Sequence, residues 1–127
     1  RVRPVLDTTP GDGRPDAIAG RALLALDRPA EAEPRLARAT AYAPEDPEGW
    51  EALARARLAL DATEGAMQAA GAWVALDPDT PAAHTLLAHA ARAHGDTAMA
   101  DAAARAALAR DADSVAAPEP PSGDGTV

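Results

Sequence analysis

The sequence predicts an all-α protein, a solenoid of three stacked helix-turn-helix repeats with six helices in all. Alanine, the best helix former, accounts for 37 of the 127 residues, whereas strong strand formers are sparse and phenylalanine is absent. The chain also repeats its own pattern of prolines and small residues after 34 positions. The predicted core is therefore thin and is built from alanine and leucine.

The breakers along the chain divide it into a helical domain and two irregular ends. Proline and glycine recur throughout residues 1–13, which we therefore expect to be irregular. Residues 114–127 are again rich in proline and glycine and are expected to form a flexible tail. The repeat domain between them is expected over 14–113, with helices at about 15–26, 30–42, 47–60, 63–76, 81–94 and 97–110.

Local signals support the start and the end of several of these helices. Asp46-Pro47 and Thr80-Pro81 each place a capping residue before a proline at the first helical position, where the missing N–H costs nothing. Gly95-Asp96 indicates a helix end followed by a new cap. Pro34 lies early in the second helix and is expected either to delay its start or to kink it.

The repeat itself is most visible in the second half of the chain. Aligning residues 47–80 with 81–114 gives 13 identities in 34 positions, and eight of them are alanine pairs. The other five pairs are Pro47/Pro81, Leu53/Leu87, Thr63/Thr97, Asp77/Asp111 and Asp79/Asp113. A fixed period of this length is typical of stacked supersecondary units.

At this period the residues resemble the tetratricopeptide repeat, whose pattern is Trp, Leu-Gly, an aromatic, Ala, an aromatic, Ala and Pro. The matches are Gly20, Ala32, Ala39 and Pro44 in the first repeat, Trp50, Leu53, Ala54, Ala66 and Pro78 in the second, and Leu87, Ala88, Ala100 and Ala107 in the third, where His84 replaces the Trp. The aromatic positions hold Leu23, Arg57 and Ala91 in the first helices and Leu36, Ala70 and Ala104 in the second helices. The resemblance implies a right-handed α-solenoid in which the small residues mark the helix crossings.

Composition and charge exclude several classes of function. The formal net charge is -8, and all twelve basic residues are arginine, so phosphate backbones and anionic lipid surfaces repel the chain. The absence of cysteine excludes disulfides and thiolate chemistry, but leaves both cytoplasm and periplasm open as compartments. No apolar run is long enough for direct membrane insertion, and we recognise no signal peptide. Because the sequence starts at Arg1 instead of Met, we expect it to derive from a longer chain.

The resemblance also implies a binding groove along the first helices of the repeats. Ninth positions of these helices, 34 residues apart, would line that groove with Arg21, Arg55 and His89. Further groove positions hold Arg14, Leu24, Glu48, Glu51, Leu58 and Arg92. Guanidinium groups suit carboxylates, so the expected ligand is an acidic partner segment or a free C-terminus.

A plainer interpretation of the same residues is a solvated helix face with ordinary ion pairs, such as Glu51 with Arg55 one turn later. The lysine and asparagine pattern with which some family members grip chaperone tails is absent, so we do not predict that ligand.

Neither catalysis nor a metal or cofactor is predicted. There is no nucleophile motif or phosphate-binding glycine loop. His84, His89 and His94 recur every five residues, which turns each by about 140° from the last on a helix, so they cannot converge on one metal ion. Instead, His84 is expected to pack in the core.

The predicted function is a protein–protein interaction module that binds an extended or helical partner segment as an assembly or scaffold factor. The alternatives are a structural spacer that self-associates through its repeat ends, or an accessory domain of a longer protein. Families with such domains often serve bacterial envelope assembly. Another alanine-rich hairpin fold with chance periodicity is a remote further alternative.

Overall fold

The computed structural model describes residues 14–116, which form six helices and no strand. They are α1 (Arg14–Ala25), α2 (Pro29–Tyr42), α3 (Pro47–Ala59), α4 (Thr63–Leu76), α5 (Pro81–His94) and α6 (Thr97–Ala116). All six predicted helices are present. The predicted irregular segment 1–13 and most of the predicted tail lie outside the described residues.

The last helix is longer than its sequence pattern predicted. α6 continues to Ala116 instead of ending near residue 110, and so includes the first residues assigned to the tail. The physical reason is the absence of a breaker, because the first proline or glycine after Gly95 is Pro118. Proline disfavours helical geometry at the residue before it, which is consistent with an end near this point.

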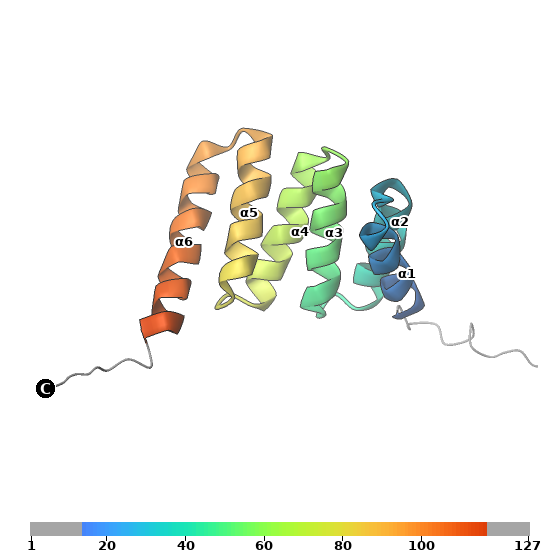
Figure 1. Cartoon of the computed structure of the whole chain (residues 1–127), viewed down its shortest axis with the longest axis horizontal. Helices are drawn as coiled ribbons and strands as arrows, with labels where there is room; N and C mark the ends of the chain where they lie inside the picture. Colours follow the sequence, from blue (N-terminus) through green and yellow to red (C-terminus); the bar gives the residue numbers. More distant parts are fainter. Residues whose placement is uncertain (1–13, 117–127) are drawn as a thin grey trace, which may run out of the picture.

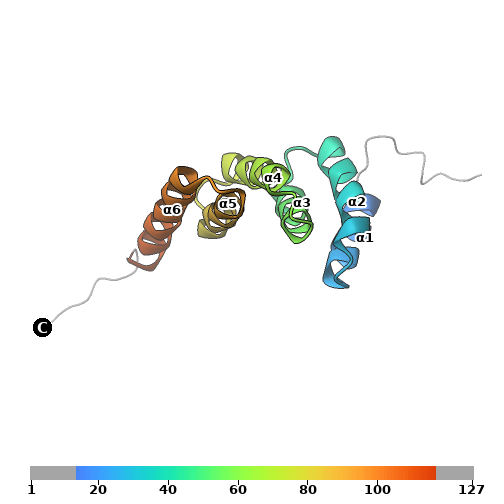
Figure 2. The same cartoon turned by 90° about the horizontal axis from the view of Figure 1, so that it is seen from above.

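The helices stack as successive hairpins in one elongated array (Figure 1). Each helix packs against its neighbours in the sequence, and α3 also contacts both α1 and α5. Seen from above, α3 and α5 lie on one side of the array and α4 lies on the other (Figure 2). The prediction of an all-α solenoid is confirmed.

Prolines and capping side chains mark several of the helix starts. Pro29, Pro47 and Pro81 each occupy the beginning of a helix, where a missing N–H leaves no bond unmade. The Asp46 carboxylate accepts the Glu48 backbone N–H at 3.1 Å, as predicted. Thr80 occupies the cap position of α5 but makes no side-chain capping bond.

Pro34 lies inside α2, which already begins at Pro29. The expectation that Pro34 delays the start of the second helix is therefore wrong. Pro29 lacks an N–H and is preorganised for the first turn, so it begins the helix before Pro34 is reached.

A left-handed residue ends the first helix of every repeat. Asp27 and Asp61 have φ of 61° and Gly95 has φ of 91°, and these three positions are 34 residues apart. In each case the backbone N–H of the next residue donates to a carbonyl of the helix. Arg28 donates to Leu23 at 2.9 Å, Ala62 to Arg57 at 2.8 Å and Asp96 to Ala91 at 2.9 Å. The predicted stop at Gly95 and cap at Asp96 are confirmed, since Asp96 also accepts the Met99 N–H at 3.0 Å.

Small residues let the two helices of each repeat approach closely, as the pattern implied. Ala54, Ala66 and Ala100 are fully buried, with an exposed fraction of 0%. A Cβ added to Gly20 would lie 2.6 Å from Leu36 Cγ, so only glycine permits α1 to approach this leucine. At the equivalent positions of the second repeat, Ala54 and Ala70 divide the same space more evenly.

His84 takes over the contact that a tryptophan makes one repeat earlier. Trp50 Nε1 donates to the Pro44 carbonyl at 2.8 Å, and His84 Nε2 lies 2.7 Å from the equivalent Pro78 carbonyl. Because a carbonyl only accepts, Nε2 carries the proton of this imidazole. His84 is also buried, so its predicted place in the core is confirmed.

Candidate functional site

Two neighbouring hollows lie along the first helices of the repeats. The hollow between α1 and α3 has a volume of about 240 Å³ and is lined by Arg21, Leu24, Ala25, Glu48, Glu51, Ala52 and Arg55. The hollow between α3 and α5 has a volume of about 310 Å³ and is lined by Arg55, Ala82, Thr85, Leu86 and His89. Because Arg55 lines both, we treat them as one groove that runs along α1, α3 and α5.

The three predicted ninth-position residues all line this groove. Arg21 lies in the first hollow, Arg55 in both and His89 in the second. The 34-residue spacing explains this arrangement, because equivalent residues of stacked hairpins project from the same side of successive helices. Leu24 and Glu51 also line the first hollow.

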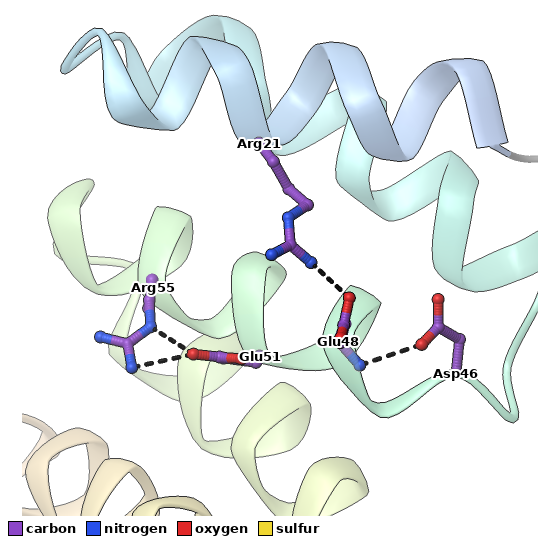
Figure 3. A network of polar contacts seen from close by, with 5 residues as sticks. All are labelled: Arg21, Asp46, Glu48, Glu51 and Arg55. Atoms are coloured by element: carbon purple, nitrogen blue, oxygen red, sulfur yellow. Dashed lines mark hydrogen bonds and ion pairs between the residues drawn. The ribbon is translucent and has the colours of Figure 1, made fainter.

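Both groove arginines form ion pairs with glutamates of α3 (Figure 3). Arg21 Nη1 lies 3.0 Å from Glu48 Oε1, and Arg55 Nη2 lies 3.0 Å from Glu51 Oε2. The capping bond of Asp46 holds the start of α3, which carries Glu48. The ion pair expected between Glu51 and Arg55 is therefore present. The first hollow holds two positive and two negative side chains.

Three predicted site residues lie outside the two hollows. Arg14 is exposed at the start of α1. Leu58 is half-buried and packs against the hydrophobic core. Arg92 is directed to α6, where its Nη2 lies 3.8 Å from an oxygen of Asp101.

Several groove residues were not predicted from the sequence. Ala82, Thr85 and Leu86 line the second hollow, and Ala52 is part of the lining of the first. A positional signal was available for the first two, since Ala82 and Thr85 follow Glu48 and Glu51 by 34 residues. Alanine and threonine carry no charge pattern, however, and only the geometry of the groove singles them out.

Neither a metal-binding cluster nor a membrane-spanning helix is found among the described residues. In residues 14–116, no three or more histidines, aspartates or glutamates gather in a way that could hold a metal ion. His94 lies 2.9 Å from Thr63 Oγ1, away from the carbonyl that His84 contacts. Over the same range, no helix combines the length and the apolarity needed to cross a bilayer.

The family model of the tetratricopeptide repeat matches residues 23–90, which is more than half of the chain. The chain belongs to the tetratricopeptide repeat family. This match confirms the resemblance inferred from the 34-residue period. The tetratricopeptide repeat is a protein-interaction fold, and the domain is accordingly a protein–protein interaction module.

Solved structures agree with the tetratricopeptide fold. The structure titled "MamA MSR-1 C2" is similar with a TM-score of 0.77 and 17% identity, covering 86% of this chain and 63% of that chain. The structure titled "MamA RS-1 ArsTM double mutant" has a TM-score of 0.78 and 22% identity, covering 86% of this chain and 61% of that chain. This chain thus spans less than two thirds of either MamA chain. No curated protein matches the sequence.

The tetratricopeptide match also shows which part of the groove follows the family pattern. It includes Leu24, Arg55 and His89 and begins after Arg21. The place of Arg21 in the groove therefore rests on the structure, in which α1 completes the first hollow.

Proposed function

We propose that this tetratricopeptide module holds an acidic segment of a partner protein, extended or helical, in the groove along α1, α3 and α5. In this role it acts as an assembly or scaffold factor, by binding and not by catalysis. The observation that supports the proposal most directly is the continuity of the groove, in which Arg21, Arg55 and His89 follow one another. Such a groove is preformed, so a partner segment alone bears the ordering cost of binding.

The ion pairs in the groove are compatible with an acidic ligand. The side chains of Arg21 and Glu48 are 49% and 70% exposed, and exposed pairs contribute roughly 0–1 kcal/mol. Arg21 uses its Nη1 in this pair, and a guanidinium carries five donors in a fixed fork. A carboxylate of the partner can therefore bind the remaining donors or replace the glutamate at low cost.

The groove also offers apolar contacts between its charged residues. Leu24 and Ala52 line the first hollow, and Leu86 lines the second. A segment that alternates acidic and apolar side chains would use both kinds of contact. The charged residues orient such a segment, whereas the buried apolar area provides most of its affinity.

Selection from a random peptide library against the native domain, followed by affinity measurement, tests this proposal. We expect the selected peptides to be acidic and to bind the variant Arg21→Gln/Arg55→Gln at least about tenfold more weakly. The matched control is Arg35→Gln/Arg38→Gln, which removes the same charge from α2, where both arginines pair with Asp16 at 3.6 and 3.2 Å.

The comparison of the two double variants decides the outcome. Equal weakening in both would show a general attraction to the positive charge and not a site, and unchanged affinity in the groove variant would refute the groove. Circular dichroism of each variant checks that the fold is retained.

A second candidate function, self-association through the repeat ends, is favoured by two exposed apolar residues. Among the described residues, the large apolar side chains with the greatest exposure are Leu108 at 70% on the last helix and Ile18 at 68% on the first. Contact between the first helix of one copy and the last helix of another would be heterologous and would build chains of molecules. Light scattering over a concentration series tests this, and Leu108→Glu should abolish any growth in mass.

A further inference from the structure

The two junctions between repeats use the same helix geometry with different side chains. The first junction joins α2, α3 and α4 at Glu33, Arg57 and Gly65. The second junction joins α4, α5 and α6, and the residues 34 positions later are Met67, Ala91 and Met99. The first junction thus has two charged residues and a glycine at these positions, whereas the second has three apolar residues.

In the first junction, Arg57 fills the space between α2 and α4. Its Nε donates to Glu33 Oε2 at 3.2 Å and its Nη1 donates to the Gly65 carbonyl at 3.1 Å. The packing is close, because a Cβ on Gly65 would lie 3.0 Å from Arg57 Cδ. The Arg57 side chain is only 21% exposed, so one arginine closes this junction from within.

The second junction is open at the equivalent place. A hollow of about 390 Å³, larger than either part of the groove, lies between α4 and α6. Its lining consists of Glu64, Met67, Gln68, Gly71, Leu87, His94, Asp96 and Met99. A Cβ on Gly71 would meet no atom within 4 Å, which agrees with open space at the wall. Ala91, which occupies the position of Arg57, is fully buried and extends no long side chain between α4 and α6.

The lining of this hollow combines apolar surface with negative charge. Met67, Met99 and Leu87 provide the apolar part, and methionine side chains adapt readily to the shape of a ligand. Glu64 and Asp96 provide two carboxylates, at positions where the first junction has Ala30 and Ala62. The acidic groups are therefore specific to the junction that lacks an internal arginine.

We propose that the hollow between α4 and α6 binds an arginine side chain of a partner protein. The apolar stem of an arginine suits the two methionines, and its guanidinium suits the carboxylates of Glu64 and Asp96. Arg57 shows within this molecule that an arginine fits the equivalent junction, where it also meets a carboxylate. The net charge of -8 further favours a basic partner segment.

This site is separate from the groove, whose lining comes from α1, α3 and α5. Of those helices only α5 contributes to the hollow, through Leu87 and His94. Figure 2 shows α4, which forms one wall of the hollow, on the side of the array opposite α3 and α5. The module would thus engage an acidic segment on one side and an arginine on the other.

The two methionines make the proposal directly measurable. The chain contains two methionines, and both line the hollow, so protein labelled with ¹³C at the methionine methyl groups reports on this site alone. The probe is the peptide acetyl-Leu-Arg-Leu-amide, with leucines included because Met99 is 41% exposed at the hollow. Its control replaces arginine with citrulline, which keeps the shape and removes the charge.

We expect saturable shifts of both methyl signals with the arginine peptide and affinity at least about tenfold lower with the citrulline peptide. Glu64→Gln/Asp96→Asn should weaken arginine binding by a similar factor, and asparagine retains the ability to cap α6. Gly71→Leu should fill the hollow and abolish binding. The matched control Ala75→Leu adds the same side chain to an exposed position of α4 and should leave binding unchanged.

Each other outcome overturns the proposal. Equal affinity for both peptides would show an apolar site without charge recognition, and binding retained in Gly71→Leu would place the peptide elsewhere. Methyl shifts that grow with protein concentration alone would mean that a second copy occupies the hollow. Arg21→Gln/Arg55→Gln should bind the arginine peptide normally, so failure of the groove and failure of this site are distinguishable.

Discussion

The first and second junctions between repeats differ in how the same helix crossing is filled. Arg57 closes the first junction with bonds to Glu33 and to the Gly65 carbonyl. The second junction, with alanine and two methionines at these positions, keeps a hollow of about 390 Å³. The repeat period thus sets where the helices cross, whereas one residue per helix decides whether the crossing is packed or open.

The sharpest test of this comparison places an arginine at each of two adjacent buried alanines of α5. Ala90 and Ala91 are both 0% exposed, but only Ala91 is equivalent to Arg57. We expect Ala90→Arg to lower the free energy of unfolding by about 3 kcal/mol or more, because it buries an unpaired charge. Ala91→Arg should change it by less than about 1 kcal/mol, since we expect its side chain to extend toward the hollow as Arg57 extends between α2 and α4.

Urea denaturation followed by circular dichroism measures both variants. Comparable losses in the two would show that the hollow does not admit an arginine. Ala91→Arg should also remove the response of the methionine methyl signals to the arginine peptide, because its own side chain then occupies the site.

Opening the first junction should lower the free energy of unfolding by less than burying an unpaired charge does. Arg57→Ala leaves the Glu33 carboxylate, 29% exposed, without its guanidinium and removes packing from Gly65. We expect a loss of about 1–3 kcal/mol in the free energy of unfolding, measured by urea denaturation. Arg35→Ala, which removes an arginine that is 47% exposed, is the control and should cost less than about 1 kcal/mol. Similar losses in both variants would contradict the packing role of Arg57.

The turns that enter the two junctions differ at their left-handed residue. Asp61 before α4 has φ of 61°, and Gly95 before α6 has φ of 91°. Gly95→Val should cost about 1–2 kcal/mol, because a β-branched residue is strained there. Gly95→Asn should cost clearly less, since asparagine tolerates this region as Asp61 does. Thermal unfolding of both variants checks the order, and equal melting temperatures would exclude backbone strain as the determinant.

The smallest change in the free energy of unfolding is expected at two glycines of α4, one in each junction. Gly71→Ala should raise the free energy of unfolding by about 0.5–1 kcal/mol, because alanine favours the helix and its Cβ meets no atom within 4 Å. Gly65→Ala should bring no gain, since its Cβ would lie 3.0 Å from Arg57 Cδ. In an Arg57→Ala background, Gly65→Ala should become stabilising. Chemical denaturation can resolve the difference, and a gain at Gly65 in the native background would refute close packing there.

Much of the fold was predictable because its signals are local and periodic. The 34-residue period predicted three hairpins, Pro47 predicted the start of a helix and Gly95 predicted the end of another. The exceptions have physical causes. Pro34 could not delay a helix that Pro29 had already begun, and α6 continued to Ala116 because no breaker precedes Pro118.

The candidate sites were predictable only in part. The period placed Arg21, Arg55 and His89 along one line, and the structure brings all three into the groove. The repeat period could not show that Arg92 is directed to Asp101 or that Arg21 pairs with Glu48. Those contacts depend on the distance between helices, which a sequence pattern does not contain.

The amino-acid order was enough to predict the number of helices, the repeat, the thin alanine-rich core and the alignment of the ninth-position residues. These follow from helix propensity, caps and spacing, which act within one helix or one hairpin. The hollow between α4 and α6, by contrast, depends on how the helices pack and is not predicted by the repeat. A hollow is the volume that side chains from α4, α5 and α6 leave unfilled, and the positions of Met67 and Met99 in the sequence do not show how far apart the helices that carry them lie.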